Sequence, residues 1–70
     1  MPEFKEGDVL IEIGGSLMCE ITDICPREYC CRWLTTPLRG LSYLERFTMI
    51  DSNFVKVGVW NKERGEIEDE

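Results

Sequence analysis

Four cysteines are the side chains of this sequence best suited to bind a metal: Cys19, Cys25, Cys30 and Cys31. Four thiolates can form a closed tetrahedral zinc site, but the spacing here is C-x5-C-x4-C-C rather than two C-x2–4-C pairs, and the chain has no histidine. Because Cys30 and Cys31 are adjacent, they would also point to opposite faces of a strand. We therefore expect reduced thiols that pack as small apolar side chains, with no metal and no cofactor.

Carboxylates are the other groups that could carry chemistry, and the chain has 14 of them. The candidates by type are Glu12, Glu20, Asp23, Glu28 and Glu45. General acid–base catalysis by two carboxylates needs a cleft that removes at least one of them from water. A chain of 70 residues forms one small core, and side chains fill the interior of so small a barrel. We therefore predict that the protein is not an enzyme.

The charge of the chain bears on its partners and on its domain limits. The formal charge is −6, and no cluster of Lys and Arg forms a basic patch, so nucleic acid is disfavoured as a partner. Half of this charge falls in residues 61–70, where two basic side chains face five acidic ones. We expect this acidic tail to be disordered and residues 1–60 to form the domain.

The sequence also bears on the compartment of the protein. No window approaches the ~18 uninterrupted apolar residues of a membrane helix. The N-terminal segment lacks the basic and apolar regions of a signal peptide. The sequence therefore predicts a soluble, cytoplasmic protein that does not contact membranes.

The elements that must position these side chains follow a period of two residues rather than 3.6. Alternating apolar residues and turn signals predict five strands, at about residues 9–13, 18–24, 29–34, 41–47 and 54–60, with a single helical turn at 48–53. In the third strand Arg32 is charged, so we expect Tyr29, Cys31 and Trp33 to face inward and Arg32 and Leu34 to face outward. This pattern predicts an all-β, single-domain, five-stranded antiparallel barrel of the SH3-like kind.

Four short segments, taken in order, carry a resemblance to a known family. They are FKEGDV at residues 4–9, GGSLM at 14–18, CRW at 31–33 and ERF at 45–47. Together they resemble the pattern of the YodC-like family of small, uncharacterised bacterial and prophage proteins, over about residues 4–57. The resemblance implies an SH3-like barrel and a phage or prophage setting, and it provides no established catalytic activity to transfer to this chain.

A protein-binding module is the function that remains once catalysis is set aside. Its expected contact residues are aromatic, basic and apolar side chains on the outward face and the loop that follows it: Arg32, Leu34, Arg39, Tyr43 and Trp60. The partner would be a larger protein of unknown identity, such as a host protein that a phage accessory protein binds or inhibits. A homodimer is a close variant, because 70 residues can need a partner for adequate burial. Trp60 has a second interpretation, as a cap on the open end of the barrel.

The alternative is a nucleic-acid-binding module of the same fold. SH3-like and OB-type modules stack bases on aromatic side chains of their strands, and Tyr29, Trp33, Tyr43 and Trp60 would form that platform. The negative charge of the body argues against this alternative. The opposite relation also stays open, in which the acidic surface imitates DNA and occupies the basic groove of a protein.

Overall fold

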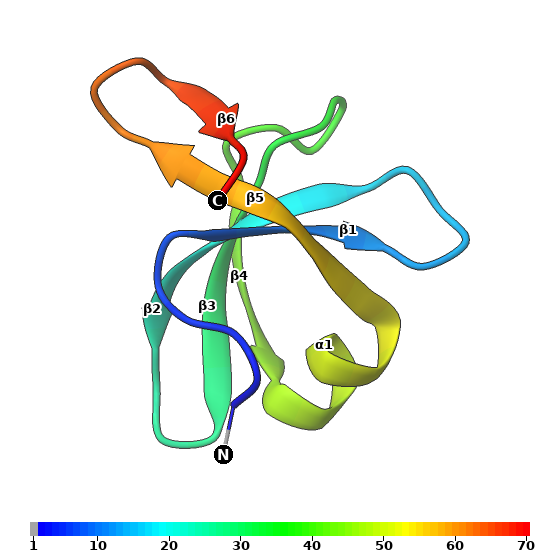
Figure 1. Cartoon of the computed structure of the whole chain (residues 1–70). Helices are drawn as coiled ribbons and strands as arrows, with labels where there is room; N and C mark the ends of the chain where they lie inside the picture. Colours follow the sequence, from blue (N-terminus) through cyan, green and yellow to red (C-terminus); the bar gives the residue numbers. More distant parts are fainter. Residues whose placement is uncertain (1) are drawn as a thin grey trace.

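Six antiparallel strands and one short helix form the part of the chain that the computed structural model describes, residues 2–70 (Figure 1). The strands are β1 (Asp8–Glu12), β2 (Met18–Ile24), β3 (Glu28–Trp33), β4 (Ser42–Arg46), β5 (Phe54–Asn61) and β6 (Glu66–Glu68). The helix α1 (Phe47–Asn53) connects β4 to β5. All six strands belong to one sheet in the order β4-β3-β2-β1-β5-β6.

The predicted all-β class, the five strands and the helical turn at 48–53 are confirmed. The barrel itself is not closed, because β4 and β6 stand at the two edges of the sheet and do not pair with each other. The helix α1 contacts β3, β4 and β5. Its side chain Ile50 is buried and belongs to the core, so the helix covers part of the apolar face of the sheet.

One face of the sheet supplies the core. Its fully or nearly buried members are Leu10, Cys19, Ile21, Tyr29, Cys31, Ile50 and Phe54. Tyr29 and Cys31 are buried and Trp33 packs against them, as the alternation in the third strand predicts. Arg32, which lies between the last two, points to the opposite face. The period-two pattern is therefore sufficient to orient β3 correctly.

The strand β1 is buried on both faces, and a bulge explains how. Its register with β5 shifts between Val9 and Leu10, so that Val9 opposes Gly58 while Leu10 opposes Lys56. Leu10 joins the core, and Val9 is equally buried on the other side of the sheet. A β-carbon on Gly58 would lie only 3.0 Å from a methyl group of Ile67, so β6 folds over the residue opposite Val9. A bulge bends its strand and increases the local twist, so the side chains of β1 on either side of it are placed differently from those of a regular strand.

The tail that the sequence predicts as disordered, residues 61–70, forms a hairpin instead. The Gly65 amide donates to the Asn61 carbonyl at 2.8 Å, and the Arg64 amide donates to Oδ1 of Asn61 at 3.0 Å. Gly65 adopts a positive φ of 64°, which glycine accepts readily. The chain then returns as β6, which pairs with the last residues of β5, so a domain limit at residue 60 would cut through a strand.

The acidic end of the chain is held by lysine. The Lys56 ammonium lies 3.2 Å from Oδ1 of the buried Asp8 and also contacts the Glu70 carboxylate. Lys5 lies 3.6 Å from the same Glu70. The Lys56 ammonium lowers the pKa of Glu70 from its usual value. Acidic composition therefore does not lead to disorder here, because local cations offset part of the charge.

The length of the helix is relevant to whether the chain could cross a membrane as a helix. Within residues 2–70, no helix has the length and the apolar character that crossing a membrane requires. The helix α1 has seven residues.

Candidate interaction surface

Four of the five residues expected to bind a partner lie together. Arg32, Leu34, Arg39 and Trp60 line one open hollow, which Gly65, Glu66 and Ile67 of the β5–β6 hairpin complete. We call Arg32, Leu34, Arg39, Trp60 and Ile67 the Arg32–Trp60 surface. The residues come from the end of β3, the loop after it, the end of β5, and β6. Segments far apart in the sequence therefore build a common face.

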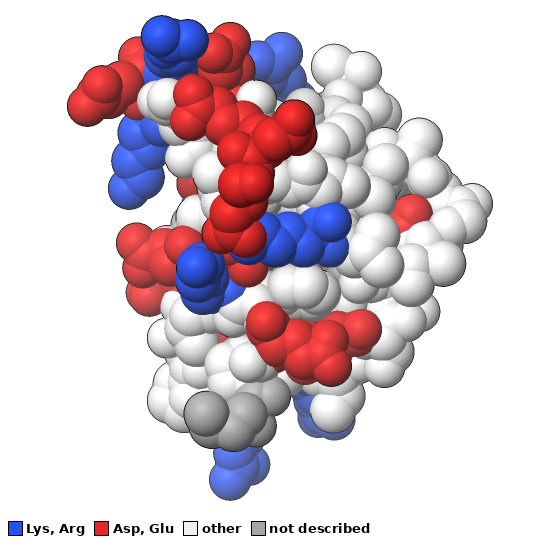
Figure 2. Space-filling view, viewed as in Figure 1, with Lys and Arg blue, Asp and Glu red and all other residues white. Residues whose placement is uncertain are grey.

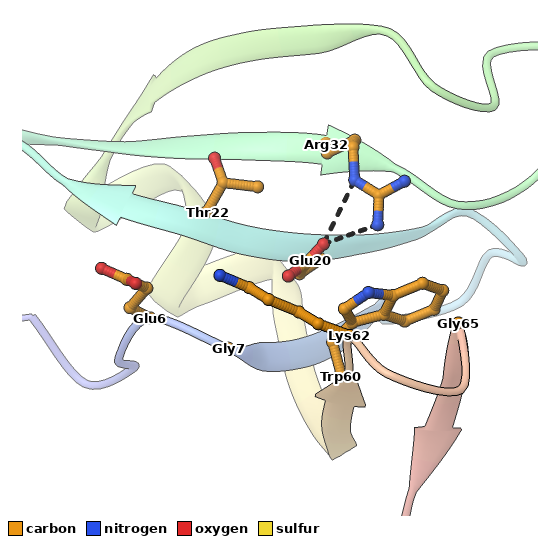
Figure 3. A pocket seen from close by; sticks show the side chains of 8 residues that line it. All are labelled: Glu6, Gly7, Glu20, Thr22, Arg32, Trp60, Lys62 and Gly65. Atoms are coloured by element: carbon orange, nitrogen blue, oxygen red, sulfur yellow. Dashed lines mark hydrogen bonds and ion pairs between the residues drawn. The ribbon is translucent and has the colours of Figure 1, made fainter.

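Arg32 is the most constrained side chain of this surface. Its Nε and Nη2 both donate to Oε1 of Glu20, at 3.2 and 2.7 Å. Its guanidinium carbon lies 5.0 Å from the centre of the Trp60 ring, within the range of a cation–π contact. Glu20 is 4% exposed, so the ion pair is shielded from water on the carboxylate side. Figure 3 shows the guanidinium facing both the Glu20 carboxylate and the indole ring of Trp60.

The register of the sheet explains how these three side chains meet. Glu20 of β2 and Arg32 of β3 are direct cross-strand partners, and side chains at opposed positions share one face. Trp60 reaches them from β5, where its amide donates to the Gly7 carbonyl at 2.8 Å and continues the pairing with β1. A charge on Glu20 would be costly in so buried a position without Arg32, so the pair is a structural unit as well as part of the surface.

A second hollow adjoins the first on the other side of Trp60. Its lining includes Glu6, Thr22 and Lys62, together with Glu20, Arg32 and Trp60 (Figure 3). The Lys62 side chain points in this view toward the side where Glu6 lies. Arg32 and Trp60 thus form a ridge between two hollows, each of which contains a basic side chain. This arrangement can bind a carboxylate and an apolar side chain side by side.

The loop that carries Arg39 is fixed at several points. The Trp33 amide donates to the Leu41 carbonyl at 2.9 Å, the Gly40 amide donates to the Trp33 carbonyl at 2.9 Å, and the Leu41 amide donates to the Leu38 carbonyl at 3.0 Å. Gly40 has a positive φ of 88°, which this tight return of the chain requires. Arg39 itself is exposed at the tip. An exposed guanidinium is therefore presented from a loop held by backbone hydrogen bonds.

Tyr43, the fifth predicted contact residue, lies elsewhere. Its ring stacks on Trp33 at 4.6 Å between centres, with only 8° between the planes. Its hydroxyl is directed at Sγ of Cys19, 3.9 Å away, and burial raises its pKa above the usual value. Tyr43 opposes Cys31 in the β3–β4 pairing, on the core face of the sheet. It therefore packs with the core rather than with the Arg32–Trp60 surface.

The aromatic platform of the nucleic-acid alternative is also divided. Tyr29 is fully buried, and its hydroxyl donates to Asp51 at 2.6 Å. Trp33 is held in the stack with Tyr43 and also contacts Phe54. Of the four proposed aromatic residues, Trp60 is the one on the Arg32–Trp60 surface. The structure thus separates side chains that base stacking would need on one face.

Three residues of the site were not among the predicted contacts: Glu20, Lys62 and Ile67. Glu20 is a charged residue among apolar neighbours, and a charge at such a position is usually paired, so the sequence indicates that Glu20 has a partner but does not identify Arg32 as that partner. Lys62 and Ile67 belong to the segment expected to be disordered. Their place becomes evident only when the β5–β6 hairpin forms, for which Asn61 and Gly65 were the available turn signals.

Neither a metal centre nor a known relative identifies the site. Among residues 2–70, no group of three or more Cys, Asp or Glu side chains is arranged to hold a metal ion. No protein-family model, no curated protein and no solved structure matches the chain.

Proposed function

We propose that the protein is a small, non-enzymatic binding module that docks on a larger protein through the Arg32–Trp60 surface. The observation that supports this most is the arrangement of Arg32, whose guanidinium contacts both a buried carboxylate and the face of an indole ring. Arg and Trp are the residue types that most often dominate binding energy at protein interfaces. Because Arg32 is already ordered, docking would cost less side-chain entropy than for a free arginine.

The lining of the surface indicates the chemistry of the partner. Arg39 is exposed and carries a positive charge, while Leu34 and the 39%-exposed Ile67 supply apolar area beside it. A protein segment that presents an acidic side chain next to an apolar one would complement this combination. Figure 2 shows acidic side chains gathered along the C-terminal strand, so a partner with a basic rim would also be steered toward this side of the molecule.

The YodC-like resemblance gives this proposal a biological setting. A phage or prophage accessory protein of this kind would act in the cytoplasm by binding, and in some cases inhibiting, a host protein. Nucleic-acid binding is a weaker proposal, because the aromatic residues are divided between core and surface and because the net charge is −6. It is kept as an outcome of the test.

The test is affinity capture from host lysate with two matched charge reversals, Arg39→Glu and Arg46→Glu. Both arginines are exposed, but Arg46 lies on β4, outside the Arg32–Trp60 surface. We expect a stoichiometric protein, resistant to nuclease, to be retained by the wild type and by Arg46→Glu, and retention to fall at least tenfold with Arg39→Glu. Tenfold corresponds to about 1.4 kcal/mol of binding free energy.

Three results would contradict the proposal. Equal loss with both charge reversals would show that net charge, rather than this surface, controls binding. Retention that disappears with nuclease would favour the nucleic-acid alternative. A mass of two chains in sedimentation equilibrium, abolished by Arg39→Glu, would show that the surface joins two copies of the protein instead.

A further inference from the structure

A pair of cysteines lies at the end of the β2–β3 hairpin, away from the Arg32–Trp60 surface. The Sγ atoms of Cys25 and Cys30 are 3.0 Å apart, and both residues are half-buried. The Cys25 amide donates to the Glu28 carbonyl at 2.8 Å and closes the turn, so Glu28 lies opposite Cys25. Cys30 lies two residues after Glu28 on the same strand and is therefore the diagonal neighbour of Cys25. Diagonal neighbours on a regular antiparallel pair are about 7–8 Å apart, so the contact between these two short side chains is closer than regular pairing would give.

The hairpin geometry holds the two sulfur atoms together. The β2–β3 register skips Thr22, since Ile21 opposes Cys31 while Asp23 opposes Cys30. A bulge increases the local twist of the strands. Here the bulge lies next to the cysteine pair, and the Sγ atoms of Cys25 and Cys30 approach to 3.0 Å. Thr22 then donates its hydroxyl to the Cys30 carbonyl at 3.1 Å and fixes the bulged backbone. The approach of the sulfurs thus belongs to an ordered hairpin with its own hydrogen bonds.

We propose that Cys25 and Cys30 are a reversible dithiol–disulfide site that exchanges with small-molecule disulfides such as oxidised glutathione. The sulfurs need to approach by only about 1 Å to reach the ~2.05 Å of a disulfide bond. The other two cysteines, Cys19 and Cys31, are 0% and 1% exposed, so the exchange partner cannot reach them in the folded protein. The proposal does not depend on the protein-binding function.

The exchange proceeds in two balanced steps. The Cys25 thiolate attacks one sulfur of oxidised glutathione, which forms a mixed disulfide and releases one glutathione thiolate. The Cys30 sulfur, as its proton leaves, then attacks the Cys25 sulfur of that mixed disulfide and releases the second glutathione. Two electrons pass from the protein dithiol to the glutathione disulfide, and two reduced glutathione molecules result.

The order of attack follows from the contact between the two sulfurs. Hydrogen bonding with Cys25 and burial together raise the pKa of Cys30 to about 11, so Cys30 keeps its proton at neutral pH. A protonated Cys30 can donate to the Cys25 sulfur. We therefore assign the first attack to Cys25 and the resolving attack to Cys30.

The test equilibrates the whole protein in buffers of oxidised and reduced glutathione, blocks free thiols with an alkylating reagent, and measures the intact mass. We expect a species whose mass is two hydrogens below that of the fully reduced protein. After unfolding, this species should take up two alkyl groups, whereas the fully reduced protein takes up four. Excess reduced glutathione should restore all four thiols. Cys30→Ser should instead accumulate a mixed disulfide with glutathione at Cys25, because the resolving thiol is absent.

A control variant and a digest separate the two cysteine pairs. Cys19→Ala should still lose two hydrogens, whereas Cys25→Ser should not. Should Cys19→Ala fail to fold, trypsin provides the same information in the wild type: cleavage after Arg27 leaves Cys25 and Cys30 on different peptides joined by the disulfide. Fragmentation of both linked peptides then distinguishes Cys25 from Cys19 in residues 6–27 and Cys30 from Cys31 in residues 28–32. Four free thiols in excess oxidised glutathione, a link between Cys19 and Cys31, or disulfide-linked dimers would each overturn the proposal.

Discussion

The hydroxyl of Tyr29 connects three parts of the chain. It donates to Oδ1 of Asp51 in α1 at 2.6 Å and accepts from the Phe4 amide at 3.1 Å, while its ring packs at the edge of Phe47. Burial and the Asp51 carboxylate raise the pKa of Tyr29 to about 12. A single oxygen atom therefore ties the N-terminal segment and the helix to β3.

Removing this oxygen should have a measurable cost. Tyr29→Phe leaves the Asp51 carboxylate and the Phe4 amide without their partner, so we expect the free energy of unfolding to fall by about 1–3 kcal/mol in chemical denaturation. Tyr43→Phe is the matched control, because its hydroxyl contacts cysteine sulfur, with Sγ of Cys19 at 3.9 Å, and should contribute less than about 1 kcal/mol. Equal losses in the two variants would contradict this interpretation.

The pH dependence of the Tyr29→Phe effect follows from the raised pKa. A tyrosine whose pKa rises from about 10 in the unfolded chain to about 12 in the fold contributes its stability fully below pH 10. That contribution is lost as the pH rises toward 12, when the phenol ionises beside Asp51. The stability difference between wild type and Tyr29→Phe should therefore shrink between pH 10 and 12. A difference that stays constant over this range would show that the hydroxyl is not responsible.

The sequence predicts the orientation of a strand well where a single residue shows which face of the sheet is buried. Arg32 orients β3 correctly, because a charged side chain is rarely buried without a partner. The sequence does not orient Tyr43 correctly, because each face of β4 carries both apolar and polar residues. Its pairing with Cys31 on the core face becomes known only from the sheet register. The pairing of Glu20 with Arg32, and the contact of Arg32 with Trp60, likewise depend on which strands are neighbours. Local patterns contain no such information.

At the scale of elements, the β5–β6 hairpin depends on a glycine. A β-carbon at Gly58 would collide with the backbone carbonyl of Glu68 and meet a methyl group of Ile67. The backbone cannot give way as a flexible side chain would, so β6 can lie against β5 only if position 58 has no side chain. The close approach, rather than the φ angle, requires glycine here.

We therefore predict that Gly58→Ala detaches β6. The free energy of unfolding should fall by about 1–3 kcal/mol, the usual cost of overpacking, and amide hydrogen exchange should accelerate in residues 66–68. Val55→Ala is the control, since Val55 lies on the same strand and is 46% exposed. Unchanged exchange in residues 66–68 of Gly58→Ala would contradict the role of this contact.

The same hairpin shows why some elements are predictable and others are not. In β3, and in the first half of β5, more buried and more exposed residues alternate, so their period of two can be recognised. The three residues of β6 are all exposed and include two glutamates, which is the composition of a solvated segment. Its pairing with β5 arises from the Asn61–Gly65 turn and from the ion pairs of Glu70, which composition does not reveal.

At the scale of the whole molecule, the open sheet has two free edges, β4 and β6. An unpaired edge can pair with another chain, and charged side chains on it oppose such contacts. Glu66 and Glu68 belong to the β6 edge, so two copies that approached edge to edge there would bring like charges together. We therefore expect the acidic end of the chain to oppose self-association through the β6 edge.

Removing these two charges should expose the edge. The double substitution Glu66→Gln and Glu68→Gln changes the net charge from −6 to −4. We expect it to increase self-association in sedimentation velocity with rising protein concentration. The pair Glu3→Gln and Glu63→Gln makes the same change of charge outside the strands and serves as the control. Identical behaviour of the two pairs would show that net charge, rather than the edge, governs association.

The different surroundings of Trp33 and Trp60 have a practical consequence, since the chain has two tryptophans. Trp33 is stacked on Tyr43 and packed against the core, so its fluorescence reports on folding. Trp60 lies against a guanidinium at the rim of an open hollow, where a docking partner would displace solvent and change its emission. In a Trp33→Phe protein, the remaining indole would serve as an intrinsic optical probe of partner binding, with no attached label.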